Sequence, residues 1–222
     1  MILAIETSTP VCSVALGRNN RVVAEKRIEG RGVHSERTFT FTQELMERFD
    51  VSIAELQAVL FSHGPGSYTG LRIGAGAVKG LLFGKSTPLW TLPTLLSFSV
   101  AAADENHSVI HSVIDARREH LYYQKIEVFG HRDLKLSEPG VQKISELEKH
   151  LNRGDIVVGT GWDRLQVENR EKIKWLGTEA ISAKNLIMAW YNEQYRPHFT
   201  EQNVETFEPE YLTMAQINNS SV

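Results

Sequence analysis

Three short polar segments hold the side chains from which a binding or catalytic site could be built. The first, residues 6–10, places the Glu6 carboxylate and the hydroxyls of Thr7, Ser8 and Thr9 directly after the apolar run 2–5. These groups could face a phosphate or a metal ion. They would equally make an ordinary polar turn that Pro10 brings to an end. The residue types leave both interpretations open.

The second segment, residues 64–70, is a glycine-rich turn that follows the apolar run 58–61 and leads into a helix expected from about Thr69. Ser67 or Thr69 could cap that helix, and its remaining free N–H groups favour an anion. The Gly-Lys-Ser/Thr of a P-loop does not follow at the required spacing, and the pattern G-x-G-x-x-G is absent. The segment therefore predicts phosphate binding only weakly.

The third segment, residues 115–118, is the densest polar cluster at a predicted strand end. The guanidinium groups of Arg117 and Arg118 could hold a carboxylate, a phosphate or an RNA backbone. A solvated turn with an internal pair between Asp115 and an arginine explains the cluster equally well. Together the three segments supply these candidate nucleotide or anion contacts: Glu6, Thr7, Ser8, Gly64, Gly66, Ser67, Arg117 and Arg118.

The histidines and the single cysteine do not form a metal-binding pattern. His107 and His111 are four residues apart, but their surroundings favour a strand, on which they would lie ~13 Å from each other. His34 could be a ligand, although a solvated or capping histidine is more common. Without a clustered set of His, Cys, Asp and Glu, the sequence predicts no metal site, and no nucleophile–base pair can be recognised from spacing.

The composition is that of an ordinary globular protein. The chain has 222 residues, 41% of them hydrophobic, and a formal net charge of −3, so no overall basic field invites nucleic acid or an anionic membrane. The lone Cys12 cannot form an internal disulfide, and the start MILAIE lacks the cationic region of a leader. No stretch approaches ~18 uninterrupted apolar residues. We expect a soluble, cytoplasmic protein without a membrane anchor.

Hydrophobic periodicity and turn residues predict an α/β fold in which one pattern occurs twice. Each half starts with antiparallel strands and continues with a strand and a helix. The halves meet near residues 100–108, which predicts an N-terminal lobe of residues 1–103 and an abbreviated C-terminal lobe of residues 104–222. The expected strands are 2–6, 12–17, 21–28, 58–61, 87–90, 109–114, 121–129 and 156–158, and the expected helix caps are Ser35, Ser52, Ser145 and Ser182.

The helix expected over residues 69–83 has an unusual surface. Two adjacent strips of small and apolar side chains cover one side, and a third strip contains Ile73, Gly76 and Gly80. Interior glycines each cost roughly 1 kcal/mol relative to alanine, so close approach of another backbone must compensate. The neighbour could be a helix of a partner, or the helix could be packed on both sides within its own domain.

Five segments together resemble the TsaB family, also called YeaZ. They are ILAIETSTPVCSVAL at the start, HSER, SHGPGSYTGLRIGAGAVKGL, DARREHLYY and the late EPEYL, and the likeness runs from Met1 to about Leu212. GPGSYTGLRIG is the most specific of them. The resemblance implies an actin-like ATPase (ASKHA) fold of two ribonuclease-H-like lobes, the second abbreviated, in agreement with the repeated pattern.

The resemblance also implies a function. TsaB-like proteins are non-catalytic subunits in the threonylcarbamoyl modification of the adenosine next to the anticodon of tRNAs that read ANN codons. They dimerise with a TsaD-like paralogue that carries the metal and the active site, and a TsaE-like ATPase joins the pair. Here residues 92–98 lack the H-x-x-x-H pair of TsaD-like proteins, and Glu6 stands where aspartate is more common. Both departures favour a subunit that is not itself an enzyme.

The family's pairing surface is a helical bundle, which here implies residues 37–49 and 69–83, for a heterodimer and for a homodimer when the partner is absent. ATP or ADP would then lie at an interface with partners and not in this chain alone, and direct contact with tRNA stays open. The alternative is a stand-alone actin-like kinase or ATPase; a peptidase is least supported. The predicted interface residues are Phe41, Leu45, Phe49, Leu71, Gly74, Ala77, Val78, Gly80 and Leu81.

Overall fold

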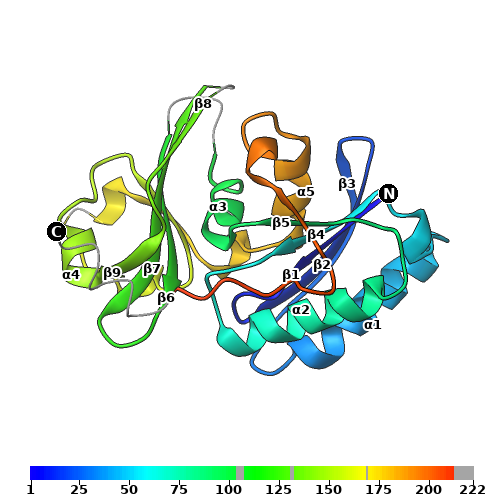
Figure 1. Ribbon diagram of the computed structural model, residues 1–222. Coiled ribbons are helices and arrows are strands. Elements are labelled where there is room, and N and C mark those ends of the chain that lie inside the picture. The colour runs from blue at the N-terminus through cyan, green and yellow to red at the C-terminus, as the bar shows by residue number, and fades with distance from the viewer. Residues whose placement is uncertain (104–107, 131–132, 169, 213–222) are drawn as a thin grey trace.

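The computed structural model describes residues 1–103, 108–130, 133–168 and 170–212, which fold into two six-stranded sheets with helices around and between them (Figure 1). The strand order of the first sheet is β12-β5-β4-β1-β2-β3. The second sheet follows the order β11-β10-β6-β7-β8, with β9 paired to β7. The predicted α/β class is confirmed.

The first sheet combines an antiparallel meander with parallel strands. The meander follows the chain through β1, β2 and β3, and the two residues of its second turn, Asn19 and Asn20, have positive φ. β1 and β5 are each parallel to β4, whose five residues are all buried because helices cover both faces of the sheet. The strands are β1 (Ile2–Glu6), β2 (Val11–Arg18), β3 (Arg21–Glu29), β4 (Ala58–Ser62), β5 (Leu89–Leu92) and β12 (Thr200–Gln202).

Helices α1 (His34–Arg48) and α2 (Tyr68–Leu82) lie on one face of the first sheet, and α5 (Ala183–Tyr191) packs on the other (Figure 1). α3 (Thr94–Ser99) lies between the two sheets. No helix within the described ranges is long and apolar enough to cross a membrane.

The second sheet starts as the first does, with an antiparallel pair followed by a parallel strand. β6 and β7 pair along their length, and β10 returns parallel to β6. The elements here are β6 (Ser108–Asp115), β7 (His120–Phe129), β8 (Asp133–Leu136), β9 (Gly140–Lys143), α4 (Ile144–Glu148), β10 (Ile156–Gly159) and β11 (Lys174–Leu176). Short 3-10 helices occur at Ile53–Glu55, Trp162–Arg164, Arg170–Lys172, Thr178–Ala180 and Arg196–His198.

The last part of the chain returns to the first sheet. After β11, α5 packs on β1, β2 and β3, and β12 pairs with β5. The reason is that the apolar face of α5, with Leu186 and Ile187 fully buried, covers the face of the first sheet that α1 and α2 leave open. We therefore use "first lobe" for the first sheet with α1, α2 and α5, and "second lobe" for the second sheet with α4. A simple division at residue 103 does not describe the sheets.

One hydrophobic cluster extends through both lobes. It joins Ala15 of β2 and Leu186 of α5 to Ile110 of β6 and Val158 of β10, with Phe98 of α3 among them. A second cluster lies under α1 and α2, and a third fills the outer face of the second sheet. The lobes thus share a core, which is unusual for parts that move independently.

Two of the predicted helix caps are confirmed. The hydroxyl of Ser67 accepts a hydrogen bond from the N–H of Gly70 at the start of α2, and that of Ser182 accepts one from Lys184 at the start of α5. The capping box at Ser52 is also present, because the Glu55 carboxylate accepts from the N–H and the hydroxyl of Ser52.

Two other predicted caps are wrong. α1 starts at His34, so Ser35 lies inside the helix, and the capping position is Val33, which has no side-chain bond to offer. Ser145 likewise lies inside α4, and the Glu148 carboxylate accepts from the N–H of Gln166 instead of closing a capping box. In both places the helix starts two residues nearer the N-terminus than the predicted cap implies.

Candidate functional site

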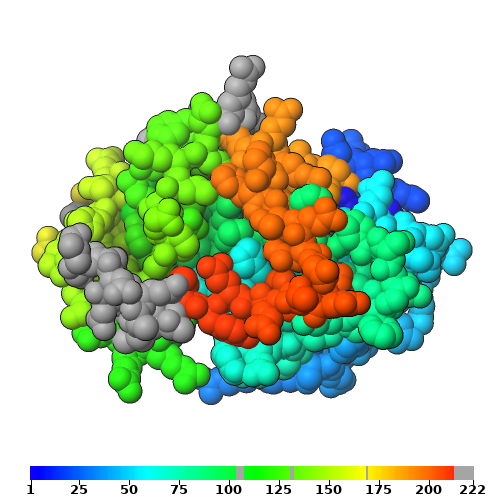
Figure 2. All heavy atoms as spheres, viewed as in Figure 1, coloured from blue at the N-terminus to red at the C-terminus, as the bar shows by residue number. Residues whose placement is uncertain are grey.

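A hollow with a volume of about 880 Å³ lies between the lobes. Figure 2 shows a notch at the lower edge of the molecule, between the green second lobe and the blue-to-cyan first lobe. The first-lobe wall is the turn after β1 and the start of α2. We call this hollow the cleft; its lining residues include Ser8, Thr9, Gly66, Ser67, Tyr68, Thr69, Asp115, Arg117, Tyr122, Thr160, Gly161, Trp162, Asp163, Thr178 and Glu179.

Glu6 does not face the cleft. Its side chain is fully buried, and one carboxyl oxygen accepts hydrogen bonds from the N–H and the hydroxyl of Ser8, at 2.7 and 2.5 Å. Burial raises the pKa of this carboxyl, and the hydroxyls of Ser62 and Ser8 offset that only in part. Glu6 therefore shapes the turn and is a poor ligand for an ion. Thr7 is also fully buried, so neither Glu6 nor Thr7 lines the cleft, whereas Ser8 does.

Gly64 lies close to the backbone of Glu210, in the last described part of the chain. Its φ is +127°, and a β-carbon there would lie 2.2 Å from the carbonyl oxygen of Glu210. The N–H of Glu210 donates to the carbonyl of His63, and the His63 Nε2 lies 3.3 Å from the Glu210 carboxylate. Gly64 thus lies against Glu210 and does not line the cleft. Gly66 and Ser67 line the cleft, although the Ser67 hydroxyl is engaged as the cap of α2.

The turn after β6 brings only one arginine to the cleft. Asp115 accepts from the N–H of Arg117 at 2.8 Å and pairs with the guanidinium of Arg164, so the predicted internal pair with Arg117 or Arg118 does not form. Arg117 and Arg118 both have positive φ, 70° and 52°. The Arg117 side chain lines the cleft, whereas Arg118 is exposed outside the lining.

The charges around the cleft do not favour a polyphosphate. Among the described residues, three acidic ones line it, Asp115, Asp163 and Glu179, against one cation, Arg117. Within the ranges that the structure describes, no three His, Cys, Asp or Glu side chains are grouped to hold a metal ion. What the cleft does offer is hydroxyls and aromatic rings. It could hold a polar ligand with one anionic group at the start of α2 and at Arg117.

The predicted interface residues divide by burial. Five of the nine are buried within the first lobe, and their side chains cannot be surface contacts: Leu45, Leu71, Gly74, Ala77 and Val78. Phe41, Phe49 and Leu81 are half-buried, and Gly80 is exposed. The accessible strip of α2 is the third one of the sequence pattern, with Ile73, Gly76 and Gly80.

Two exposed aromatic rings of the first lobe were missing from the predicted interface. Phe83, directly after α2, is 84% exposed, and Phe39 on α1 is 47% exposed. The available signal was the spacing: Phe83 lies three and seven residues after Gly80 and Gly76, on the strip that faces away from the sheet. We call the residues Ile73, Gly76, Gly80 and Phe83 the α2 strip.

The glycines of α2 have different neighbours. A β-carbon at Gly74 would lie 2.2 Å from the Thr7 hydroxyl and 2.6 Å from the ring of Phe61, so the close approach that compensates for this glycine is to the chain's own sheet. At Gly76 and Gly80 nothing lies within 4 Å. The fold itself therefore accounts for Gly74, whereas Gly76 and Gly80 face open space.

The segment after β12 runs along α2 as a strap, the orange-to-red chain across the middle of Figure 2. We define it as residues 203–212. Its Phe207 is buried against Phe61, with ring centroids 6.0 Å apart, and Lys79 of α2 donates to the carbonyl of Glu205. The strap includes EPEYL, one of the segments that carried the family resemblance.

Two histidines are buried. His34 of α1 lies 2.7 Å from the carbonyl of Thr9, so it is neither the solvated nor the capping residue expected. The ring nitrogens of His111 each lie 3.0 Å from a partner, Nδ1 from the Tyr123 hydroxyl and Nε2 from the Asp155 carboxylate. Burial lowers the pKa of His111, although Asp155 by itself would raise it. His107, its partner in the predicted non-metal pair, is outside the described residues.

The fold is that of a two-lobed α/β protein of the actin-like, ribonuclease-H-like class. Its two sheets share one strand pattern, the cleft lies between them, and α3 lies at their junction. A family model described as TsaD, tRNA N6-adenosine threonylcarbamoyltransferase, matches residues 29–159. The chain is 32% identical over 168 residues to the tRNA threonylcarbamoyladenosine biosynthesis protein TsaB of Escherichia coli (strain K12), with 72% of this chain and 71% of that protein covered. The chain belongs to the TsaB (YeaZ) family.

Two further comparisons agree with this family assignment. The Haemophilus influenzae protein of the same description is 29% identical over 172 residues, with 72% of each chain covered. The solved structure of YeaZ from Pseudomonas aeruginosa superposes with a TM-score of 0.75 at 25% identity, covering 95% of this chain and 99% of that one. The predicted family and fold are confirmed.

Proposed function

We propose that this chain acts in tRNA threonylcarbamoyladenosine biosynthesis as a non-catalytic subunit that docks onto a TsaD-like paralogue and activates it, with a TsaE-like ATPase joining the pair. The names of its relatives support the pathway. The observation that carries the docking role is the α2 strip, which leaves Gly76 and Gly80 open and Phe83 84% exposed. A helix bearing small residues beside an aromatic ring suits close contact with another helix.

The cleft supports the non-catalytic part of the proposal. The only carboxylate of the turn after β1, Glu6, is buried and engaged with Ser8. The lining carboxylate Asp115 is paired with Arg164, and Glu179 accepts from the N–H of Gly177. A general base or a magnesium ligand would have to be supplied by Asp163 or by the partner.

Docking is tested by co-elution with a TsaD-like partner. Gly80→Leu adds a side chain on the α2 strip, where nothing within the fold obstructs it, and should abolish co-elution while the circular dichroism spectrum stays that of wild type. Gly140→Leu is the matched control, because Gly140 also has open space but lies on β9 of the second lobe. Normal co-elution of both variants would remove α2 from the interface.

The same strip should form a homodimer when the partner is absent. Light scattering after gel filtration should then report a dimer for wild type and Gly140→Leu, and a monomer for Gly80→Leu. A dimer in all three would place self-association on another surface.

The activity itself is tested by reconstitution with the partners and an ANN-reading tRNA, scoring modified adenosine by mass spectrometry. Modification should require this chain, and Gly80→Leu should reduce it. The double variant Arg117→Ala/Arg118→Ala examines the exposed turn after β6 separately. Reduced modification with intact co-elution would assign that turn to contact with RNA or nucleotide.

The second candidate is a stand-alone actin-like kinase or ATPase, favoured by the position of Gly66, Ser67 and Arg117 on the cleft. Calorimetric titration of the isolated chain with Mg-ATP separates the two proposals. We expect no binding by the chain alone, with any ATP or ADP held at the interface with partners. Tight binding with turnover by the isolated chain would overturn the docking proposal in favour of the kinase.

A further inference from the structure

One part of the cleft wall belongs to the segment that links β11 to α5, residues 177–182, which we call the connector. Thr178 and Glu179 of the connector line the cleft. Its own bonds make one 3-10 turn, in which Ala180 donates to the carbonyl of Gly177 and Ile181 to that of Thr178. The position of this wall therefore depends on what holds the connector from outside.

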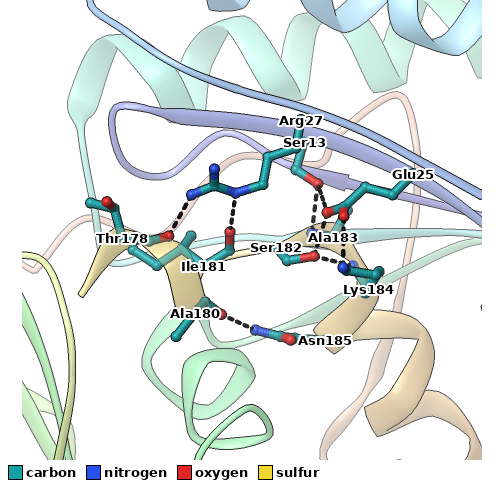
Figure 3. A network of polar contacts seen from close by, with 10 residues as sticks. All are labelled: Ser13, Glu25, Arg27, Thr178, Ala180, Ile181, Ser182, Ala183, Lys184 and Asn185. Atoms are coloured by element: carbon teal, nitrogen blue, oxygen red, sulfur yellow. Dashed lines mark hydrogen bonds and ion pairs between the residues drawn. The ribbon is translucent and has the colours of Figure 1, made fainter. Parts of the chain in front are cut away.

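Strand β3 holds it. Arg27 donates from Nε to the carbonyl of Ile181 at 3.0 Å and from Nη2 to the carbonyl of Thr178 at 2.6 Å (Figure 3). The planar guanidinium thus engages both ends of the 3-10 turn at once, a geometry that lysine cannot reproduce. Glu29 adds a third contact, accepting from the Thr178 hydroxyl at 2.7 Å.

A second set of bonds holds the start of α5. The Glu25 carboxylate accepts from the hydroxyls of Ser13 and Ser182 and pairs with Lys184 at 2.9 Å (Figure 3). The Ser13 hydroxyl in turn accepts from the N–H of Ala183. Burial alone would raise the pKa of Glu25, but these donors outweigh it and hold the pKa below its usual range.

The sequence places the three charged side chains on one side of β3. Residues two apart in a strand point to the same face, so Glu25, Arg27 and Glu29 all point toward the connector and α5. Charged residues on a sheet face that is covered by a helix are costly unless they are paired. Here that cost is offset by the bonds to the connector.

We propose that Arg27 and Glu25 fix the opening of the cleft, so that the two lobes move as one rigid body and the cleft does not close around a ligand. Closing or opening would shift the connector against β3 and break the bonds of Arg27 and Glu29. It would also disrupt the hydrophobic cluster that α3 and α5 share with β6 and β10. A ligand of the cleft, or a partner segment, meets a groove of constant width.

The test measures a distance across the cleft with two spin labels. Cysteines replace the exposed Ser35 of α1 and the exposed Glu119 of the turn before β7, and the single native thiol, Cys12, is buried. Pulsed electron paramagnetic resonance should give one narrow distance distribution for the wild-type background. Arg27→Ala should lose the narrow distribution and become broad while its circular dichroism spectrum is unchanged.

The matched control is Arg21→Ala on the same strand. The Arg21 side chain is exposed and makes no hydrogen bond or ion pair within the described part of the chain, so its removal should leave the distribution narrow. A narrow distribution for Arg27→Ala, or equal broadening for both variants, would overturn the proposal. If Arg27→Ala does not fold, Arg27→Lys replaces it as the test, because lysine keeps the charge and loses the two-pronged contact. A broad distance distribution for Arg27→Lys would then support the proposal, and a wild-type distribution would overturn it.

Discussion

Individual residues of the first turn act within the fold. Glu6 and Thr7 have the chemistry of a phosphate or metal site, yet both side chains point into the first lobe, where Glu6 orders the turn through Ser8 and Thr7 fills the space left by Gly74. The surface that remains for a ligand consists of neighbouring hydroxyls and backbone. A carboxylate in a first turn therefore identifies an actin-like phosphate site only when it is exposed to the cleft.

The buried carboxyl of Glu6 should make stability depend on pH. Because its pKa is raised in the folded chain, the folded state binds more protons than the unfolded state above the unfolded pKa of 4.5, so stability falls as pH rises through that window. Glu6→Gln keeps an acceptor for Ser8 without the titration. The stability of Glu6→Gln relative to wild type should increase from pH 4.5 to pH 7.5. The increase should be about 1.4 kcal/mol for each unit by which the pKa of Glu6 in folded wild type exceeds its unfolded value.

Urea unfolding of both proteins at several pH values checks this, because subtracting wild type from the variant cancels the other titrating groups. A difference that is constant across pH would mean that Glu6 titrates alike in the folded and unfolded chain.

Gly74 and Gly76 should respond oppositely to the same substitution. Gly74→Ala places a methyl group against Thr7 and Phe61 and should destabilise by about 1–3 kcal/mol. Gly76→Ala meets open space and should stabilise by about 0.5–1 kcal/mol through helix propensity. Urea denaturation midpoints measure both, and each variant is the other's control. A gain in stability for Gly74→Ala would show that the backbone of α2 moves away from β1 at little cost.

At the scale of elements, α2 has two different faces. Its inner face packs on the first sheet through Leu71, Val78 and Leu82, and the outer α2 strip, which we propose as the docking surface, has open space at Gly76 and Gly80. The strap lies beside it and is held by the buried ring of Phe207, by the bond from Lys79 to the carbonyl of Glu205 and by the contacts of Glu210 with His63. Because the strap includes Glu210, which approaches Gly64, it also fixes the loop before α2.

Phe207→Ala should release the strap. Removing a buried aromatic ring that contacts Phe61 should cost about 3–5 kcal/mol, and limited proteolysis should then cleave within residues 203–212 while the rest of the chain stays resistant. Tyr211→Ala is the control, because its ring is partly exposed and its loss should cost less than about 1 kcal/mol. Equal resistance of Phe207→Ala and wild type would show that other contacts hold the strap.

At the scale of the whole molecule, the shared core joins two lobes that the chain builds largely one after the other. α3 enters between the sheets, and α5 returns from the second lobe to cover the first. Neither sheet can bury both faces without an element supplied by the other half. Cooperative unfolding of the two lobes follows from this arrangement.

The lobes should therefore unfold in a single transition. Trp90 and Trp190 report on the first lobe, and Trp162 and Trp175 on the second. In the double variant Trp162→Phe/Trp175→Phe, and in the converse variant, the midpoint of urea unfolding by fluorescence should coincide with the midpoint by far-ultraviolet circular dichroism. Separate midpoints in either variant would show that a lobe unfolds alone.

The sequence by itself determined the local structure and the family. Apolar periodicity located the main strands and helices, hydroxyl residues at Ser67 and Ser182 set two helix starts, and the segment around GPGSYTGLRIG led to the family and its two-lobed fold. Such features depend on near neighbours in the chain, and the sequence contains them directly. The short strands β8, β9, β11 and β12 escaped prediction because their three or four residues leave little periodicity.

Only the tertiary structure decided which side of each element is buried. Three strips of α2 consist of small or apolar residues, so the sequence pattern did not decide which of them faces the sheet, as Leu71 and Val78 do, and which faces outward, as Gly80 does. The turn after β1 and the charged side chains of β3 likewise owe their roles to segments far along the chain, Gly74 for Thr7 and the connector for Arg27. Burial and pairing at such distances depend on how the elements pack, and a local pattern does not contain that information.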